Sequence, residues 1–285
     1  MKEIRVYLEG GLGNQLFQFS TGYALSKYFD AKLSINIGKL ISDNAHTGYA
    51  LDGFKVPEIE VNCDRALSLT DKSVIRYSGV LRLFNFYNES DYLNIRSSAE
   101  LVRLIGYWQN ECYFKDFKSE LKKMFVPKRR GNCIESMIFG VEKSKKISVH
   151  FRRGDYVNNN KAYDFHGVCS LSYYKSAMDY FDDLYDGDVE FFIFTNDPAW
   201  VLSVMDHFDI GNFNLVAEST PHQDIYLMSL CDGHIIANSS FSWWGAWLSS
   251  NDGVVIAPDK WYSKPPKINA DPCLPTWLRL RRDEA

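Results

Sequence analysis

The chain has 285 residues, which is long for one hydrophobic core and favours a division into two domains. Its 32 Lys and Arg residues are outnumbered by 36 Asp and Glu residues, and the net charge of −4 argues against general nucleic-acid binding. No run of ~18 apolar residues is present and the six cysteines show no Cys-x-x-Cys spacing, which excludes a transmembrane helix, a disulfide framework and a zinc finger.

The chain begins with a strand, a glycine turn and a helix. Residues 4–8 alternate like a strand, 10–14 form a tight turn, and 15–29 carry apolar residues at nearly helical spacing. This order is typical of the start of a parallel α/β domain. The next expected elements are strands at 31–37 and 101–107 and an amphipathic helix at 115–124. Most of the segment between the two strands is too mixed in composition to order.

The second half alternates strands and helices more regularly. The expected strands are 147–151, 189–194, 214–216, 234–237 and, as the last strand, 254–257. The expected helices are 172–181, 198–205, 224–231 and 241–248. A basic stretch with a proline, 127–131, marks the approach to a domain boundary. We therefore expect two Rossmann-like α/β domains, residues 1–140 and 141–285, that face each other across a cleft.

The expected strand at 147–151 carries His150 near its end, and Arg152 and Arg153 follow it directly. Arginine's planar fork of donors binds phosphate oxygens two at a time, and ligands of parallel sheets bind at the carboxyl ends of the strands. The pattern favours a site for a phosphorylated or nucleotide ligand. The alternative is a pair of surface arginines that form salt bridges beside the turn at 154–155.

The turn at 10–13 matches a dinucleotide-binding fingerprint only in part, because Leu16 occupies the position of the third glycine. The glycines would let a ligand approach the backbone closely. Asn14 would then face the ligand from the start of the helix. An ordinary strand–helix turn, with Asn14 as the helix cap, is the alternative.

Ser239 and Ser240 lie between a strand and a helix, where hydroxyls and free backbone N–H groups form an anion site. Simple capping by Ser240 or Ser242 is the alternative. Since this turn and the arginine pair both follow strands of one sheet, we favour a diphosphate ligand. No Asp-x-Asp pair ends a strand, so arginine and helix N–H groups, without a metal, would neutralise a leaving diphosphate.

Two further side chains have both a functional and an ordinary interpretation. Asp224 can accept hydrogen bonds from a guanine edge, or it is a solvated charge on its helix. His166 lies on a polar loop and is a candidate general base, although a single loop histidine is more often uninvolved.

Four blocks together resemble the α-1,2-fucosyltransferase family, glycosyltransferase family 11. They are GGLGNQLFQ at 10–18, VHFRRGDY at 149–156, FTNDPAW at 194–200 and NSSFSWWGAWL at 238–248. The resemblance implies a GT-B architecture whose C-terminal domain holds GDP-L-fucose. It also implies inverting transfer of fucose to the 2-hydroxyl of a terminal β-galactoside, with no cofactor and no essential metal.

The resemblance also implies roles for single residues. Arg152 would contact the β-phosphate, His150 and Asp224 the guanine, and Ser240 the diphosphate. Asn14 would line the cleft from the N-terminal, acceptor-side domain and belong to the donor-binding residues. Arg153 and Ser239 complete the expected donor-binding set. The expected catalytic residues are Arg152, Asp155 and His166. The alternative role of Asp155 is structural, fixing the positions of Arg152 and Arg153.

The absence of a signal-like apolar segment leads us to expect a cytoplasmic enzyme that builds surface glycans such as O-antigen or capsule. Its acceptor would be lipid-linked and would bring the protein to the inner membrane surface through the basic run 128–130. A solvated linker explains those charges equally well. The alternative functions are a transferase of the same fold with another sugar, linkage or acceptor, and a non-catalytic nucleotide-sugar-binding protein.

Overall fold

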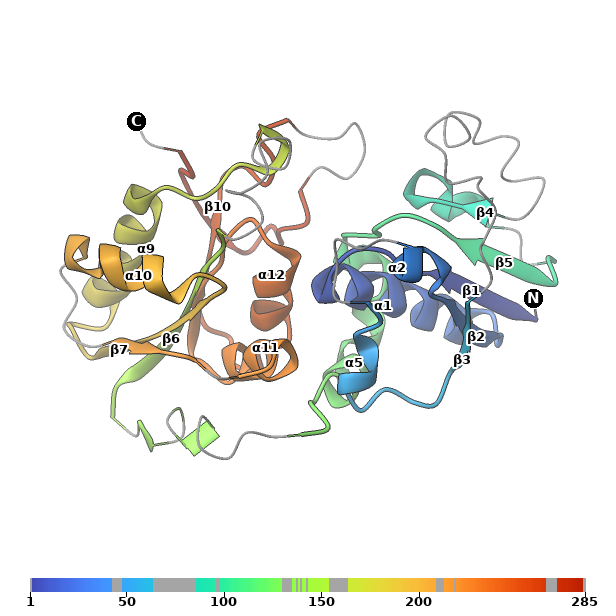
Figure 1. Cartoon of the computed structure of the whole chain (residues 1–285), viewed down its shortest axis with the longest axis horizontal. Helices are drawn as coiled ribbons and strands as arrows, with labels where there is room; N and C mark the ends of the chain where they lie inside the picture. Colours follow the sequence, from blue (N-terminus) through green and yellow to red (C-terminus); the bar gives the residue numbers. More distant parts are fainter. Residues whose placement is uncertain are drawn as a thin grey trace. The chain divides into compact units, whose positions relative to one another are not determined.

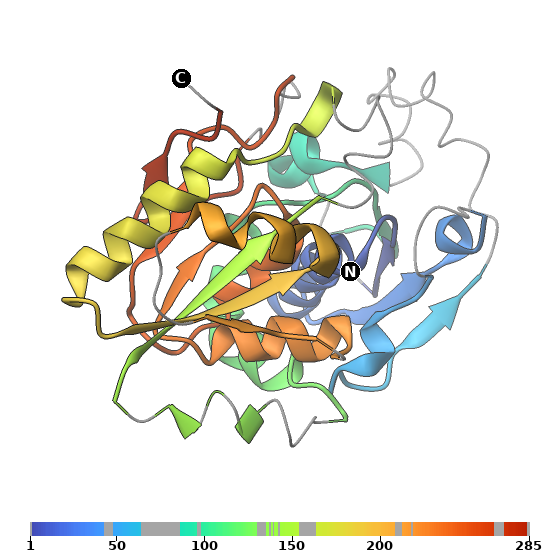
Figure 2. The same ribbon diagram turned by 60° about the vertical axis from the view of Figure 1, so that its left-hand side comes forward.

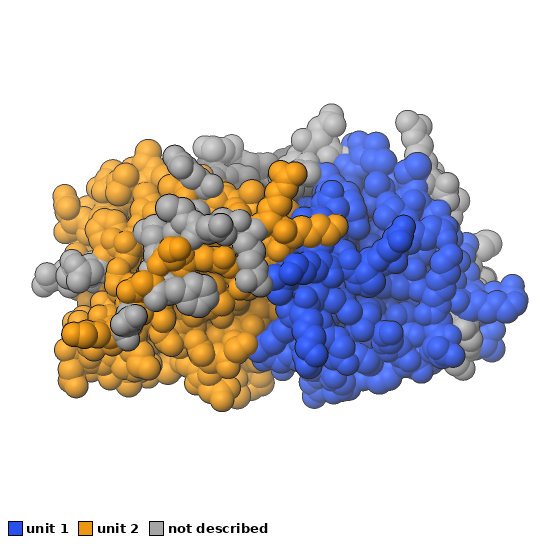
Figure 3. Space-filling model, turned by 90° about the horizontal axis from the view of Figure 1, so that it is seen from below, with its two compact units in different colours: residues 1–126 blue, residues 127–285 orange. Residues whose placement is uncertain are grey.

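The computed structural model describes residues 2–42, 48–63, 86–95, 98–129, 135–136, 138, 140–141, 143–153, 164–208, 213–217, 219–264 and 271–283 (Figure 1). The chain divides into two compact units, Met1–Val126 and Pro127–Ala285, which are coloured separately in Figure 3. None of the helices in the described ranges is long and apolar enough to cross a membrane.

The first unit contains a five-stranded parallel sheet in the order β3-β2-β1-β5-β4. Its strands are β1 (Glu3–Tyr7), β2 (Lys32–Asn36), β3 (Glu60–Asn62), β4 (Phe86–Tyr87) and β5 (Leu101–Leu104). β1 therefore lies at the centre, between β2 and β5. The three strands predicted for this half are present, and β5 ends three residues earlier than predicted.

Helix α1 (Leu12–Tyr28) is buried on almost every side. Gly22 lets it pack closely on the sheet, because a Cβ atom there would lie 2.2 Å from Val6 Cγ2. Its other side is covered by aromatic side chains, as in the contact of Phe19 with Phe125. The smaller elements of this unit are α2 (Gly38–Ser42), η1 (Leu51–Gly53), η3 (Glu89–Asn94), η4 (Glu111–Tyr113), η5 (Lys115–Phe117) and α5 (Lys118–Met124). The helix predicted at 115–124 is thus a 3₁₀ turn followed by α5.

The second unit contains a six-stranded parallel sheet in the order β11-β10-β9-β6-β7-β8. Its strands are β6 (Lys145–Phe151), β7 (Val189–Thr195), β8 (Phe213–Leu215), β9 (Gly233–Ile235), β10 (Val255–Pro258) and β11 (Leu278–Leu280). The prediction that the strand near 254–257 is the last one was wrong, because β11 adds an edge strand beside β10.

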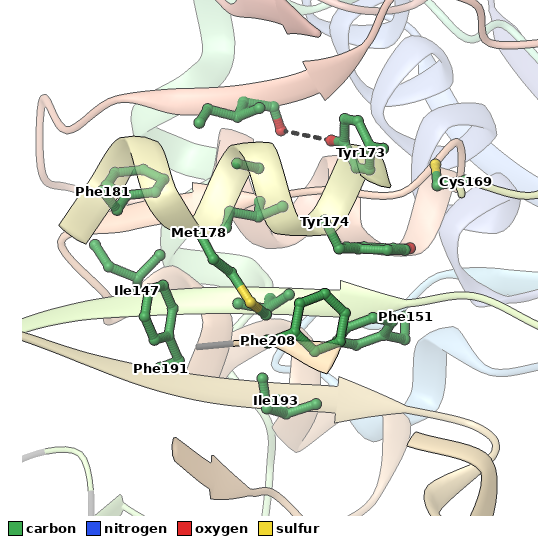
Figure 4. Close-up of a cluster of buried hydrophobic side chains, with 14 of the residues drawn as sticks. Ile147, Phe151, Cys169, Tyr173, Tyr174, Met178, Phe181, Phe191, Ile193 and Phe208 are labelled. Atoms are coloured by element: carbon green, nitrogen blue, oxygen red, sulfur yellow. Dashed lines mark hydrogen bonds between the residues drawn. The ribbon is translucent and has the colours of Figure 1, made fainter. Parts of the chain in front are cut away.

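Helices cover both faces of this sheet (Figure 2). They are α9 (Leu171–Leu184), α10 (Pro198–Val204) with the short turn η6 (Met205–His207), α11 (Pro221–Ser229) and α12 (Ser240–Trp247). On one face, α9 packs Tyr174, Met178 and Phe181 against Ile147 and Phe151 of β6 (Figure 4). On the other, α11 packs on Phe192 and Phe194 of β7 and contacts α12.

Helix α11 begins three residues before the predicted start. Thr220 caps it: the Thr220 side chain accepts from Gln223 N, and the Gln223 side chain accepts from Thr220 N. Pro221, whose fixed φ suits a first helical position, follows the cap. This capping box is readable in the sequence and brings Asp224 into the first turn of the helix.

Candidate active site

The carboxyl ends of β6, β7 and β9 lie side by side in the second sheet and carry three of the blocks singled out in the sequence. β6 is the central strand of the three, with Phe151 paired to Thr195 of β7 and Val149 paired to Ile235 of β9. Because the strands are parallel, the residues that follow each of them gather at one edge. This edge is where open α/β sheets bind ligands.

His150 points from β6 toward the face covered by α12. Its side chain is 4% exposed, its ring lies 5.5 Å from that of Phe241, and its Nδ1 has no hydrogen-bond partner among the described residues. Burial, assisted by the positive charge of Arg152, lowers the pKa of His150 to about 3. The imidazole is therefore neutral at physiological pH, which suits a neutral heterocycle better than a phosphate.

The two arginines after β6 point in different directions. Arg153 stacks on Trp200, with the guanidinium carbon 3.9 Å from the ring centroid, and its Nε lies 3.8 Å from Asp197 Oδ2. Arg152 lies close enough to His150 to lower the pKa of that residue. Alternation along an extended chain explains the split, since 150 and 152 share one face and 151 and 153 the other. Arg152 is thus the arginine on the His150 side.

The serine turn after β9 supplies the start of α12. Ser239 is the helix cap, its side chain accepting from Phe241 N at 3.3 Å, whereas the hydroxyl of Ser242 points back to Ala237 O. The capping interpretation therefore holds for Ser239 and not for Ser240 or Ser242. The Ser240 side chain is half-buried at the first position of α12. Its position beside the first N–H groups of α12 suits an anion.

Asp224 lies in the first turn of α11, on the same side of the sheet as His150. Burial raises the pKa of its carboxyl to about 6, and a hydrogen bond from the Ser219 hydroxyl opposes part of that rise. Asp224 is therefore not the solvated helix charge of the ordinary interpretation. It is a partly desolvated acceptor whose pKa is raised toward 6 by burial.

The loop that carries His166 is held by two residues that the sequence interpretation missed. The amide of Asn238 donates to the carbonyls of His166, Gly167 and Trp261 at 3.0–3.2 Å. Arg282, whose side chain is 3% exposed, donates to the His166 carbonyl at 2.7 Å and to Ser263 Oγ at 2.9 Å.

The His166 ring itself lies 5.6 Å from that of Tyr262. Gly167 has a φ of 68°, and a Cβ atom there would lie 2.5 Å from Ser263 Oγ. The loop conformation is therefore fixed by glycine and by hydrogen bonds to its backbone. The position of His166 is set from three strands, β9, β10 and β11, after which Asn238, Tyr262 and Arg282 follow.

The remaining predicted residues lie elsewhere. Asp155 falls in 154–163, outside the described residues. Asn14 belongs to the first unit, where the N-cap of α1 is Gly11 and the Asn14 side chain instead accepts from Gln109 Nε2 at 2.7 Å. Within the described ranges, no three His, Cys, Asp or Glu side chains gather as metal ligands do. Metal independence stays a prediction.

Comparison with known proteins places these features in a family. The model of glycosyl transferase family 11 matches residues 89–281. An α-1,2-colitosyltransferase of Escherichia coli is 32% identical over 96% of this chain and 98% of its own length. The O-antigen biosynthesis glycosyltransferase WbnK of Escherichia coli is 29% identical over 96% of this chain and 99% of its own. A galactoside α-(1,2)-fucosyltransferase 2 of Bos taurus is 27% identical over 96% of this chain and 78% of its own length.

The fold has a counterpart among solved structures. The fucosyltransferase NodZ from Bradyrhizobium matches with a TM-score of 0.50 and 13% identity, over 87% of this chain and 93% of that one. This likeness, with the two parallel sheets, confirms the predicted GT-B-like α/β class. From its family match and its relatives, the chain belongs to glycosyltransferase family 11.

Proposed function

We propose that the chain transfers L-fucose from GDP-L-fucose to the 2-hydroxyl of a terminal β-galactoside, with inversion at the anomeric carbon. One juxtaposition carries this proposal. Arg152 follows β6 beside the buried, neutral His150, and the first turn of α12 contacts the ring of that histidine through Phe241. A guanidinium, a helix N-terminus and an imidazole nitrogen that has no partner among the described residues together suit a nucleoside diphosphate.

The expected chemistry uses these groups in sequence. When the anomeric C–O bond breaks, its electron pair stays on the β-phosphate, and Arg152 with the N–H groups of α12 stabilises the negative charge that develops. The acceptor 2-hydroxyl attacks the opposite face of the sugar and loses its proton. His166, held by Asn238 and Arg282, and Asp155 are the candidate bases. Arg153 and Ser239 keep supporting roles around the donor.

A second donor is favoured by a specific observation. The E. coli relative that is 32% identical is named for colitose, a sugar that differs from L-fucose only by lacking the 3-hydroxyl. A site that hydrogen-bonds this hydroxyl rejects the deoxy sugar strongly, whereas an apolar site accepts both. The donor therefore has to be identified by direct competition between the two.

The test is GDP release and product NMR with GDP-L-fucose and GDP-colitose as donors, lactose and N-acetyllactosamine as acceptors, and EDTA present. We expect an α-1,2 linkage and an unchanged rate in EDTA. Another linkage would assign the chain to a different transferase of the same fold. Donor binding without turnover on any acceptor would favour the non-catalytic alternative, and loss of the rate in EDTA would contradict metal independence.

We expect the affinity for GDP-L-fucose to rise with pH through the pKa of Asp224. At a pKa of about 6 the ionised fraction grows from about one-tenth at pH 5 to nine-tenths at pH 7, so the affinity for guanine should rise nearly tenfold. GDP-L-fucose suits this titration because its diphosphate does not titrate in that range. Calorimetry with Asp224→Asn provides the control, which should show a flat profile; a retained slope would assign the effect to another group.

The same shift has a consequence for stability. Between pH 3.8 and about 6 the folded state binds more protons at Asp224 than the unfolded state, so the contribution of this residue to stability falls as the pH rises. Above pH 6 its ionised form is buried at a cost. Asp224→Asn should therefore raise the melting temperature relative to wild type more at pH 7.5 than at pH 4.

The cellular setting is also a proposal. The relative named for O-antigen biosynthesis supports a role in surface-glycan assembly. We further propose a lipid-linked acceptor at the cytoplasmic face of the inner membrane. Lys128 and Arg129 of the basic run are exposed, and Arg130 lies outside the described residues. Binding to anionic vesicles that is lost in Lys128→Ala/Arg129→Ala would support a membrane contact through this run.

A further inference from the structure

The first unit carries a second group of polar side chains, at the carboxyl edge of its own sheet. β1 and β5 are neighbours in register, so the loops that follow them lie together. Asn14 comes from the first of these loops and Gln109 from the second, and Gln109 Nε2 donates to Asn14 Oδ1 at 2.7 Å. Both side chains are partly exposed. The pair therefore lies at the edge where parallel sheets bind ligands.

The loop that presents Gln109 is held in an uncommon conformation. Trp108 is fully buried and has a φ of 56°, a region that bulky residues rarely adopt. Glu89 holds it there: one carboxylate oxygen, Oε1, accepts from both Tyr107 N and Trp108 N at 2.7 Å. Gly106 leaves room for this carboxylate, since a Cβ atom would lie 2.7 Å from Glu89 Oε2. Backbone strain that the surroundings enforce is typical of functional sites.

The loop that presents Asn14 is fixed to the same frame. Gln18 is buried and joins both loops, because its Oε1 accepts from Glu9 N at 3.0 Å and its Nε2 donates to Gly106 O at 3.1 Å. Gly10, with a φ of 76°, leaves space for the Asn14 amide, which a Cβ atom would approach to 2.6 Å. The relative positions of Asn14 and Gln109 are therefore set by buried groups beneath them.

We propose that Asn14 and Gln109 bind the hydroxyls of the acceptor galactoside, with Tyr107 as an apolar face beside them and Glu89 as a positioning residue. Amide side chains both donate and accept, as sugar hydroxyls require, and the pair carries no charge that would attract a phosphate. The Tyr107 side chain is 44% exposed, which leaves a ring surface for a pyranose. This inference rests on the proposed transfer to a galactoside.

The test compares Gln109→Ala with a neighbouring amide variant, Asn110→Ala. Asn110 lies on the same loop, but its side chain accepts from Cys112 N and caps η4. We expect Gln109→Ala to raise the KM for lactose about tenfold, equivalent to about 1.4 kcal/mol, while the KM for GDP-L-fucose and the slow hydrolysis of the donor without acceptor stay within twofold. Asn110→Ala should leave both KM values within twofold.

The positioning role of Glu89 is tested by comparing the acceptor KM of Glu89→Ala with that of the conservative variant Glu89→Gln. Glu89→Ala should raise the acceptor KM as Gln109→Ala does, whereas Glu89→Gln keeps an accepting oxygen and should restore most of the affinity. An unchanged lactose KM in Gln109→Ala, or an equal rise in Asn110→Ala, would overturn the proposal. If the protein turns over no donor, binding of methyl β-D-galactopyranoside is measured by ligand-observed NMR. Binding that is lost in Gln109→Ala but kept in Asn110→Ala supports the site. Any other pattern overturns it.

Discussion

Arg152→Ala is expected to lower kcat for sugar transfer by about 10²- to 10³-fold, the range seen when one preorganised donor to developing negative charge is removed. Arg152 is the arginine on the His150 side of the sheet edge, and its charge contributes to the low pKa of that histidine. The variant should keep its melting temperature, because Arg152 follows the strand and lies outside the hydrophobic core. Steady-state GDP release together with thermal unfolding measures both effects.

Arg153→Ala is the matched control for this prediction. It removes the contact with Trp200 and the partly exposed ion pair with Asp197, each worth about 1 kcal/mol or less. It should therefore lower stability slightly and kcat far less than Arg152→Ala does. Arg152→Lys keeps the charge but loses the bidentate fork and should recover part of the rate. Nearly full activity in Arg152→Ala would contradict the assigned role.

Asn238→Ala is expected to lower the free energy of unfolding of the second unit by about 3 kcal/mol. The amide donates to three backbone carbonyls, of which that of His166 keeps its hydrogen bond from Arg282 in the variant. Each buried carbonyl that loses its partner costs about 1–3 kcal/mol. Transfer activity should fall as well, since the loop of His166 loses its fixed position. Urea unfolding followed by tryptophan fluorescence suits this measurement, because the three buried tryptophans of α12 belong to the same unit.

Asn238→Asp tests whether the hydrogen bonds of Asn238 or its shape stabilise the unit, and Asn251→Ala is a control at a second amide. Asn238→Asp has nearly the same shape but cannot donate to the carbonyls, so it should be at least as destabilising as Asn238→Ala at pH 7. Asn251→Ala removes a less buried amide that donates to Cys231 O at 3.0 Å, and should cost about 1 kcal/mol. Equal losses in Asn238→Ala and Asn251→Ala would show that water replaces the buried amide.

Much of the fold could be predicted because the alternation of strands and helices is regular in the second half of the chain. β11 was missed because Leu278–Leu280 is only three residues long and shows no periodicity of its own. In the first unit, the short strands β3 and β4 fall in the segment that could not be ordered. Their placement depends on pairing with distant strands, which a local pattern does not encode.

The candidate site was predicted in part for similar reasons. His150 and Ser239 each lie in a block that is continuous in the sequence. The two blocks follow parallel strands of one sheet, whose carboxyl ends lie at the same edge. Arg152 and Arg153 were predicted to act as a pair. Their different directions follow from the alternation of side chains along an extended chain. The sequence predicts no role for Asn238 or Arg282, because both donate to backbone carbonyls of distant segments and such contacts leave no spacing pattern.

The contact between Arg282 and the His166 carbonyl also bears on how the protein folds during synthesis. The two residues are 116 positions apart, and Arg282 follows the edge strand β11. On a ribosome, β6 to β9 can pair while this last segment is still inside the exit tunnel. The loop of His166 gains its final hydrogen bonds only when residue 282 has emerged, so we expect a nascent chain to fix this loop after the rest of the six-stranded sheet has formed.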